Sequence, residues 1–147
     1  MIPKKTILLA DDDEDDRDLF REALNNIGYD CELIMMNNGE KVIDFFTNIK
    51  TAPDFIFLDI NMPRINGIEC LKFIKANYPS NNFHVIMLST ATGLPVVEQS
   101  DKNGASLYIQ KPSRFNDLTK YISYCLMDLQ HASIEEEFIL NKRLKDS

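Results

Sequence analysis

The chain has 147 residues and a hydrophobic fraction of 44%, which is the size and composition of a single globular domain. Its formal net charge of −7 argues against a protein that binds nucleic acid by neutralising phosphates, because such binding needs a basic face. No apolar run approaches the roughly 20 residues of a membrane-spanning helix, so we expect neither a nucleic acid nor a membrane among its partners.

The first residues, MIPKK, lead directly into a strand-like run, without the apolar stretch and cleavage site of a secretion signal. Cys31, Cys70 and Cys125 lie far apart and lack the spacing of metal ligands. Scattered thiols of this kind are typical of reduced core residues in the cytosol. The expected location is therefore the cytoplasm.

Short apolar runs alternate with segments whose apolar residues recur every three or four positions, a pattern that predicts a parallel sheet with helices on both faces. The predicted strands are residues 6–10, 31–36, 55–58, 85–88 and 107–110. Helices are predicted around 19–27, 42–49, 68–74, 95–103 and 118–129. The helix at 95–103 has only Val96 and Val97 as an apolar face, and we expect it to be the least firmly held.

Five strand–helix units in this order predict a doubly wound α/β fold with strand order 2-1-3-4-5, since right-handed crossovers leave few other topologies. Such sheets bind ligands beyond the carboxyl ends of their strands, at the switch point between the first and third strands. Asp11 and Asp12 follow the first predicted strand, and Asp59 follows the third. Three carboxylates are thus expected in one crevice.

Neighbouring carboxylates raise one another's pKa values unless a cation joins them. Mg²⁺ suits this set, because it binds one or two carboxylates and keeps waters that a phosphate can replace; Mn²⁺ is a possible substitute. A calcium loop from Asp11 to Glu22 has acids at the right spacing, but Asp16 stands where that loop requires glycine. The sequence therefore predicts a magnesium site.

Two further polar residues end neighbouring predicted strands at the same edge. Ser89 follows the fourth strand and Lys111 follows the fifth. A hydroxyl and an ammonium that face a metal ion and a carboxylate can together neutralise the oxygens of a phosphoryl group. Each residue alone would be an ordinary turn or surface residue, but the set predicts a phosphoryl-transfer site.

These residues resemble the motifs of the receiver domain of two-component response regulators, of the stand-alone, CheY-like type with a flavodoxin-like fold. The resemblance runs from about residue 4 to about residue 129. It rests on the acid pair after the first strand, LDINMPRING after the third, the serine after the fourth and KP after the fifth. It implies that Asp59 is the phosphoacceptor and that Lys111 contacts the phosphoryl group, beside a cis bond to Pro112.

The resemblance also implies the metal ligands and the residues that tune the switch. Asp12 and Asp59 would bind Mg²⁺ directly, Asp11 largely through water, and Asn61 through its backbone carbonyl. Phosphorylation would shift Ser89 and rotate Tyr108, and the phosphoryl lifetime would depend on Asn61, Thr90 and Ala91. Because Ala91 has no polar side chain to orient a water molecule, we expect slow self-dephosphorylation.

The function implied is a signalling switch and not an enzyme, apart from self-phosphorylation and autodephosphorylation. A sensor histidine kinase or a histidine phosphotransfer protein would donate the phosphoryl group. The surface of the fourth helix, fifth strand and fifth helix would then bind an unidentified downstream protein or a second copy of the chain. The segments LSTAT and KPSRFNDL resemble small regulators that serve phytochrome-type kinases.

The chain is expected to divide into a receiver domain at residues 1–129 and a helical extension at 130–147, without an output domain. Ser133 and Glu136 have capping-box spacing, which predicts a short helix at about 134–144. An apolar edge on this helix is expected to dock on its own domain, with docking on a partner as the alternative.

Two other functions remain open from the sequence. Asp11 and Asp13 have the DxD spacing of haloacid dehalogenase-type phosphatases, but Asp15 stands where that family usually has Thr or Val. A pseudo-receiver that binds partners without phosphorylation is the other alternative. The complete set of acids, serine and lysine argues against it.

Overall fold

The computed structural model describes residues 4–49, 51–79, 82–91, 93–127, 129 and 138–143, with the side chains of 142 and 143 left aside. The elements, in chain order, are β1 (Lys5–Ala10), α1 (Glu14–Ile27), β2 (Cys31–Met36), α2 (Gly39–Asn48), β3 (Phe55–Leu58), α3 (Gly67–Asn77), β4 (His84–Ser89), α4 (Leu94–Lys102), β5 (Leu107–Gln110), α5 (Phe115–Met127) and α6 (Leu140–Arg143). Within the described ranges, no helix combines the length and the apolar character needed to cross a lipid bilayer.

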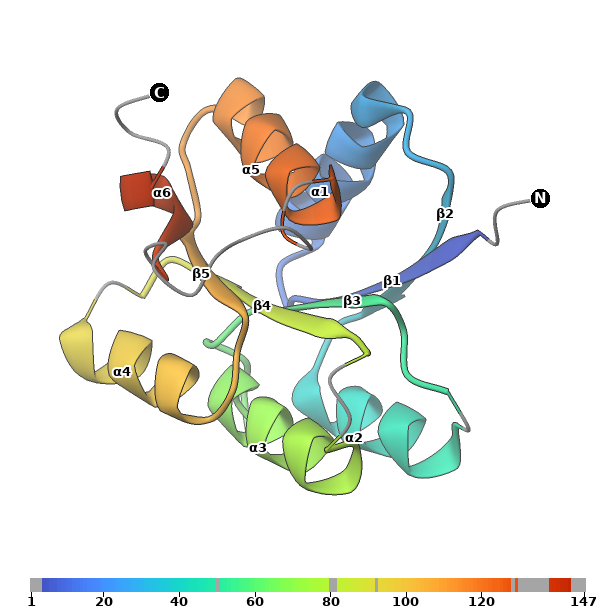
Figure 1. Ribbon diagram of the computed structural model, residues 1–147, viewed down its shortest axis with the longest axis vertical. Helices are drawn as coiled ribbons and strands as arrows, with labels where there is room; N and C mark the ends of the chain where they lie inside the picture. The colour runs from blue at the N-terminus through green and yellow to red at the C-terminus, as the bar shows by residue number, and fades with distance from the viewer. Residues whose placement is uncertain are drawn as a thin grey trace.

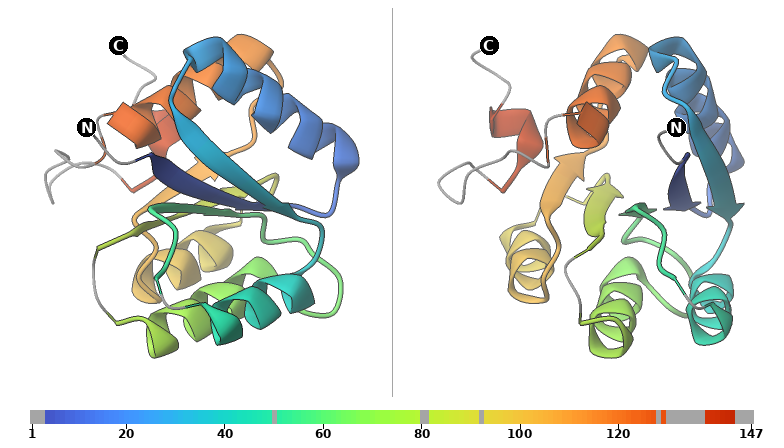
Figure 2. Two further views of the ribbon diagram at one scale, coloured as in Figure 1. Left: turned by 90° about the vertical axis from the view of Figure 1, so that its right-hand side faces the viewer. Right: turned by 45° about the vertical axis from the view of Figure 1, so that its right-hand side comes forward.

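The five strands form one parallel sheet in the order β2-β1-β3-β4-β5, which confirms the predicted topology. Helices α1 and α5 cover one face of the sheet, and α2, α3 and α4 cover the other (Figure 1). The two further views show the same three layers, with the sheet strongly twisted between them (Figure 2).

Alternate residues of the central strands supply the two halves of the core. In β3, whose four residues are all buried, Ile56 and Leu58 pack on the side of α2 and α3. Phe55 and Phe57 pack on the side of α1 and α5. Because a strand turns successive side chains to opposite faces, a strand covered on both faces must be continuously apolar. This arrangement explains the uninterrupted FIFL sequence.

The acidic residues that follow Asp11 and Asp12 form the start of α1. The side chain of Asp13 caps the helix and accepts the backbone N–H of Asp16 at 3.0 Å. Glu14, Asp15 and Asp16 form the first turn, where the partial positive charge of the helix N-terminus stabilises acidic side chains. Gly28 ends the helix with φ 73°, a left-handed conformation that favours glycine.

The loop after β3 folds back tightly onto the first residue of α3. The N–H of Gly67 donates to the carbonyl of Ile60 at 3.0 Å. A β-carbon at Gly67 would collide with the backbone oxygen of Asp59 and lie 2.8 Å from the Cα of Ile60. Only glycine therefore allows the backbone to approach this closely beside Asp59.

The C-terminal segment, residues 138–143, lies along the outer edge of β5. The carbonyl of Phe138 accepts the N–H of Tyr108 at 3.0 Å, and the side chain of Asn141 bonds both the N–H (2.8 Å) and the carbonyl (3.0 Å) of Gln110. Leu140 is fully buried in the core on the side of α1 and α5. The described part of the extension thus docks on its own domain.

The last helix was predicted at about 134–144, and this prediction was wrong for residues 138 and 139, which are described and are not helical. Helix α6 begins only at Leu140, while Ile139 forms a parallel bridge with Tyr108. The edge of β5 offers unpaired backbone groups, and pairing with them requires extended backbone instead of a helix. Residues 134–137 and 144, including most of the predicted first turn, lie outside the described residues.

Candidate functional site

The acidic residues meet because neighbouring strands end together. The N–H of Asp59 donates to the carbonyl of Ala10, the last residue of β1, at 2.9 Å. Carboxylate oxygens of Asp11, Asp12 and Asp59 lie within 4.8 Å of one another. Three oxygen donors at this spacing fit a hard divalent cation, and the sequence predicted that these three carboxylates meet.

Burial differs among the three acids. Asp11 is 1% exposed, and this burial raises the pKa of its carboxyl to about 6, although hydrogen bonds from Lys111 and Asp13 oppose the rise. Asp59 is 4% exposed, and its Oδ1 accepts the backbone N–H of Asn61 at 3.3 Å. Asp12 is exposed and supplies the open side of the group.

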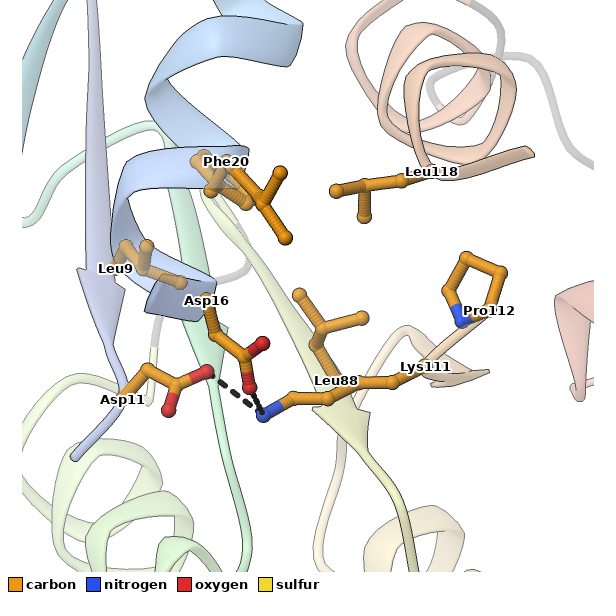
Figure 3. A pocket seen from close by; sticks show the side chains of 9 residues that line it. Leu9, Asp11, Asp16, Phe20, Leu88, Lys111, Pro112 and Leu118 are labelled. Carbon is orange, nitrogen blue, oxygen red and sulfur yellow. Dashed lines mark hydrogen bonds and ion pairs between the residues drawn. The ribbon is translucent and has the colours of Figure 1, made fainter. Parts of the chain in front are cut away.

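Lys111 brings a positive charge into this cluster from the end of β5. Its Nζ lies 2.8 Å from Asp11 Oδ2 and 2.8 Å from Asp16 Oδ2 (Figure 3). It also lies 3.4 Å from Asp59 Oδ2. Burial alone would lower the pKa of the ammonium, but hydrogen bonds to Asp11 and Asp16 raise it above its ordinary value. The lysine is therefore charged and shared by three carboxylates.

The first turn of α1 also belongs to the site, which the sequence analysis missed. Asp16 binds Lys111, and Arg17 donates from Nη1 to the backbone carbonyl of Asp11 at 2.8 Å. The capping residue could have indicated the place of Asp16. If Asp13 caps α1, the first turn of the helix, which includes Asp16, lies directly beyond the end of β1. In the sequence alone, Asp16 stands out only as the residue at the position where a calcium loop requires glycine.

A small cavity of about 50 Å³ lies between α1 and α5 beside Lys111. Figure 3 shows Phe20, Leu88 and Leu118 around it, with Lys111 reaching past Leu88 to the acids. Apolar surroundings lower the local dielectric, so the charges of Lys111 and its partners interact more strongly here than in water.

Ser89 and Tyr108 both meet the backbone of Ala91. Ser89 is fully buried, and its Oγ accepts the N–H of Ala91 at 3.2 Å. Tyr108 is 1% exposed, and its hydroxyl donates to the carbonyl of Ala91. Burial raises the pKa of the phenol, so it is protonated at neutral pH. Thr90, which lies between Ser89 and Ala91 in the chain, is exposed.

The expected cis bond before Pro112 was wrong: none of the described peptide bonds is cis, and the Lys111–Pro112 bond is among them. Lys111 already reaches all three carboxylates with a trans bond. The trans form of a bond to proline is also favoured by about 0.5–1 kcal/mol.

Comparison with known proteins gives one consistent result. A family model described as response regulator receiver domain matches residues 7–123. Response regulator Rcp1 of Synechocystis sp. is 30% identical over 125 residues, which cover 82% of this chain and 85% of Rcp1. Sporulation initiation phosphotransferase F of Bacillus subtilis is 31% identical over 112 residues, covering 76% and 86%.

Solved structures agree with these similarities. The Mn²⁺-bound form of Rcp1 matches with a TM-score of 0.75 at 28% identity, covering 88% of this chain and 97% of that one. The phosphorylated cyanobacterial phytochrome response regulator RcpA matches with a TM-score of 0.78, covering 91% and 100%. At 24% identity, the second likeness shows the fold alone.

Proposed function

The chain belongs to the family of response regulator receiver domains, and we propose on this premise that it is a phosphoaspartate switch with Asp59 as the phosphoacceptor. Receiver domains of two-component systems are signalling switches that bind a divalent metal. One observation carries the proposal: the buried carboxylate of Asp59 lies beside Asp11 and Asp12 and 3.4 Å from the ammonium of Lys111.

The chemistry assigns a role to each charged group. A carboxylate oxygen of Asp59 attacks the phosphorus of a phosphohistidine, the bond from phosphorus to the donor imidazole breaks, and an acyl phosphate forms. Mg²⁺, held by Asp11, Asp12, Asp59 and the backbone carbonyl of Asn61, would offset the charge of the phosphoryl oxygens. Lys111, whose Nζ lies 3.4 Å from Asp59 Oδ2, supplies a second positive charge.

The switch would act through the backbone of Ala91. A phosphoryl group of about −1.5 to −2 charge on Asp59 offers the hydroxyl of Ser89 a strong acceptor. Movement of Ser89 away from the N–H of Ala91 would release the segment to which Tyr108 is bonded. The surface of α4, β5 and α5 would then change and bind a downstream protein.

The phosphoryl lifetime is expected to be long, because Ala91 lacks a side chain that could orient an attacking water. We expect Ala91→Glu to shorten the half-life of the phosphorylated protein several-fold, and Ala91→Gly to leave it nearly unchanged. Intact-mass measurements after removal of the phosphodonor follow the decay. An unchanged half-life in Ala91→Glu would contradict this assignment. Asn61 and Thr90 are the other two residues proposed to influence the lifetime of the phosphoryl group.

The phosphodonor is proposed to be a sensor histidine kinase or a histidine phosphotransfer protein in the cytoplasm, with a phytochrome-type kinase as the first to test. A second copy of the chain is an alternative to an unrelated downstream protein. Because the C-terminal segment already bonds the backbone of Tyr108 and Gln110, such a dimer would rest on side chains of α4 and α5 and not on sheet pairing through these residues.

The proposal is tested by intact mass after incubation with acetyl phosphate or phosphoramidate and Mg²⁺. We expect the gain of one phosphoryl group, lost in Asp59→Asn and in EDTA and retained in the matched control Asp15→Asn. Absence of the adduct with both donors and with a panel of histidine kinases would indicate a pseudo-receiver. Rapid, repeated release of free phosphate would instead favour the phosphatase.

A further inference from the structure

Lys111 has two nearest acceptors, and one of them, Asp16, has no role in the proposed phosphoryl transfer. Its Nζ lies 2.8 Å from both Asp11 and Asp16, closer than to the proposed phosphoacceptor Asp59 at 3.4 Å. We infer that Asp16 is a positioning residue, which holds the ammonium of Lys111 beside the site when a divalent cation engages Asp11 and Asp59. The inference rests on the proposed function.

The carboxylate of Asp16 is fixed in place by the start of α1. The backbone N–H of Asp16 donates to the capping side chain of Asp13 at 3.0 Å. The next residue, Arg17, donates to the carbonyl of Asp11 at 2.8 Å, which ties the first turn to the end of β1. Asp16 thus approaches Lys111 from the α1 side, as Figure 3 shows.

Competition for carboxylates gives Asp16 its role. Asp11 and Asp59 are partners of Lys111 and also belong to the three acids that fit a cation. A bound cation would repel the nearby ammonium and draw on the same two carboxylates. Asp16 does not belong to that group of three acids. It can therefore remain the partner of Lys111 while the others are engaged.

Asp16 would in this way reduce the antagonism between the lysine and the cation. Without it, the carboxylates that contact Lys111 among the described residues are only the cation's own candidate ligands, Asp11 and Asp59. The ammonium would then either compete with the cation or leave the site. In both cases Asp59 would lose one of the two positive charges proposed to receive a phosphoryl group.

A double-mutant cycle on cation affinity tests this inference. Calorimetric titration with Mg²⁺ and with Mn²⁺ would give the dissociation constants of wild type, Asp16→Asn, Lys111→Gln and the double variant at constant ionic strength. We expect Asp16→Asn to weaken binding about threefold or more beyond the control Asp15→Asn, which removes the same charge from an exposed acid in the same turn. In the Lys111→Gln background this excess should disappear.

Conservative replacement separates positioning from folding. Asp16→Glu keeps the charge and should recover most of the lost affinity, and thermal unfolding would verify that each variant is folded. Equal weakening by Asp16→Asn and Asp15→Asn, in both backgrounds, would overturn the inference. Intact mass of the same wild-type sample distinguishes the two proposals. Absence of the phosphoryl adduct with both small donors and with the panel of kinases refutes the phosphoaspartate switch, whereas the effect of Asp16 on cation affinity can still be measured.

Discussion

Gly67 stands where the loop from β3 folds back against the backbone of Asp59. We expect Gly67→Ala to destabilise the fold by about 1–3 kcal/mol, because its β-carbon would push against backbone atoms that cannot move aside without displacing Asp59. Urea unfolding measures the loss. In the control Gly93→Ala, the new β-carbon would meet its nearest atom at an ordinary 3.8 Å, and stability should change by less than about 0.5 kcal/mol. Equal effects of the two substitutions would contradict the argument.

Asp11 makes the stability of the cation-free protein depend on pH. Burial raises its pKa from 3.8 to about 6 in the folded state. The folded protein therefore holds this proton more strongly than the unfolded chain, so the contribution of Asp11 to stability falls as pH rises from about 4 to about 6 and stays low above.

We expect Asp11→Asn to stabilise the protein in EDTA by about 1–3 kcal/mol at pH 7.5, with the gain shrinking towards pH 4.5. Urea unfolding of both proteins at the two pH values tests this expectation, with Asp15→Asn as the control for net charge. A loss of stability at pH 7.5 would mean that the ion pair with Lys111 outweighs the burial of the charge. Cation affinity should fall in Asp11→Asn in either case.

The C-terminal segment acts at the level of secondary structure, because it converts β5 from an edge strand into a paired one. Asn141 replaces a neighbouring strand at Gln110 by bonding both its N–H and its carbonyl. Asn141→Ala should therefore speed hydrogen exchange at the amide of Gln110 about tenfold. The amide of Lys111, which donates to Ser89 in β4, is the internal control. Similar acceleration at both amides would indicate loosening of the whole strand.

Helix α4 contrasts with the other helices in how little of it is buried. Ser100 is its one fully buried residue within the described range, and Leu94 at its start is 66% exposed. Val96 and Val97 are half-buried and pack against the core. The expectation that α4 is the least firmly held helix agrees with this burial and stays a prediction until exchange rates are measured.

At the scale of the whole molecule, a cation that binds only the folded protein must stabilise it. At a Mg²⁺ concentration of about 100 times the dissociation constant, the gain is about 2.7 kcal/mol. We expect thermal unfolding to shift upward accordingly in wild type and in Asp15→Asn, and the shift to be largely lost in Asp12→Asn. Removal of the cation with EDTA should reverse it. An equal shift in Asp12→Asn would place the cation elsewhere on this acidic chain.

Much of the molecule follows from the sequence because the strands are apolar on both faces and end in polar residues. The predicted strand order places Asp11, Asp59 and Lys111 at one edge of the sheet, where the structure also has them. Asp16 escaped prediction because its role depends on the direction in which the first turn of α1 leaves β1, which is a tertiary property. The backbone at Phe138 and Ile139 depends on the free edge of β5, which no local pattern of the segment encodes.

Residues 138–141 also bear on how separate chains associate. Their backbone and the side chain of Asn141 occupy the hydrogen-bonding edge of β5. A chain truncated before Phe138 would expose that edge, which can template pairing with another chain. Shortened proteins should therefore precipitate during expression more readily than the full chain.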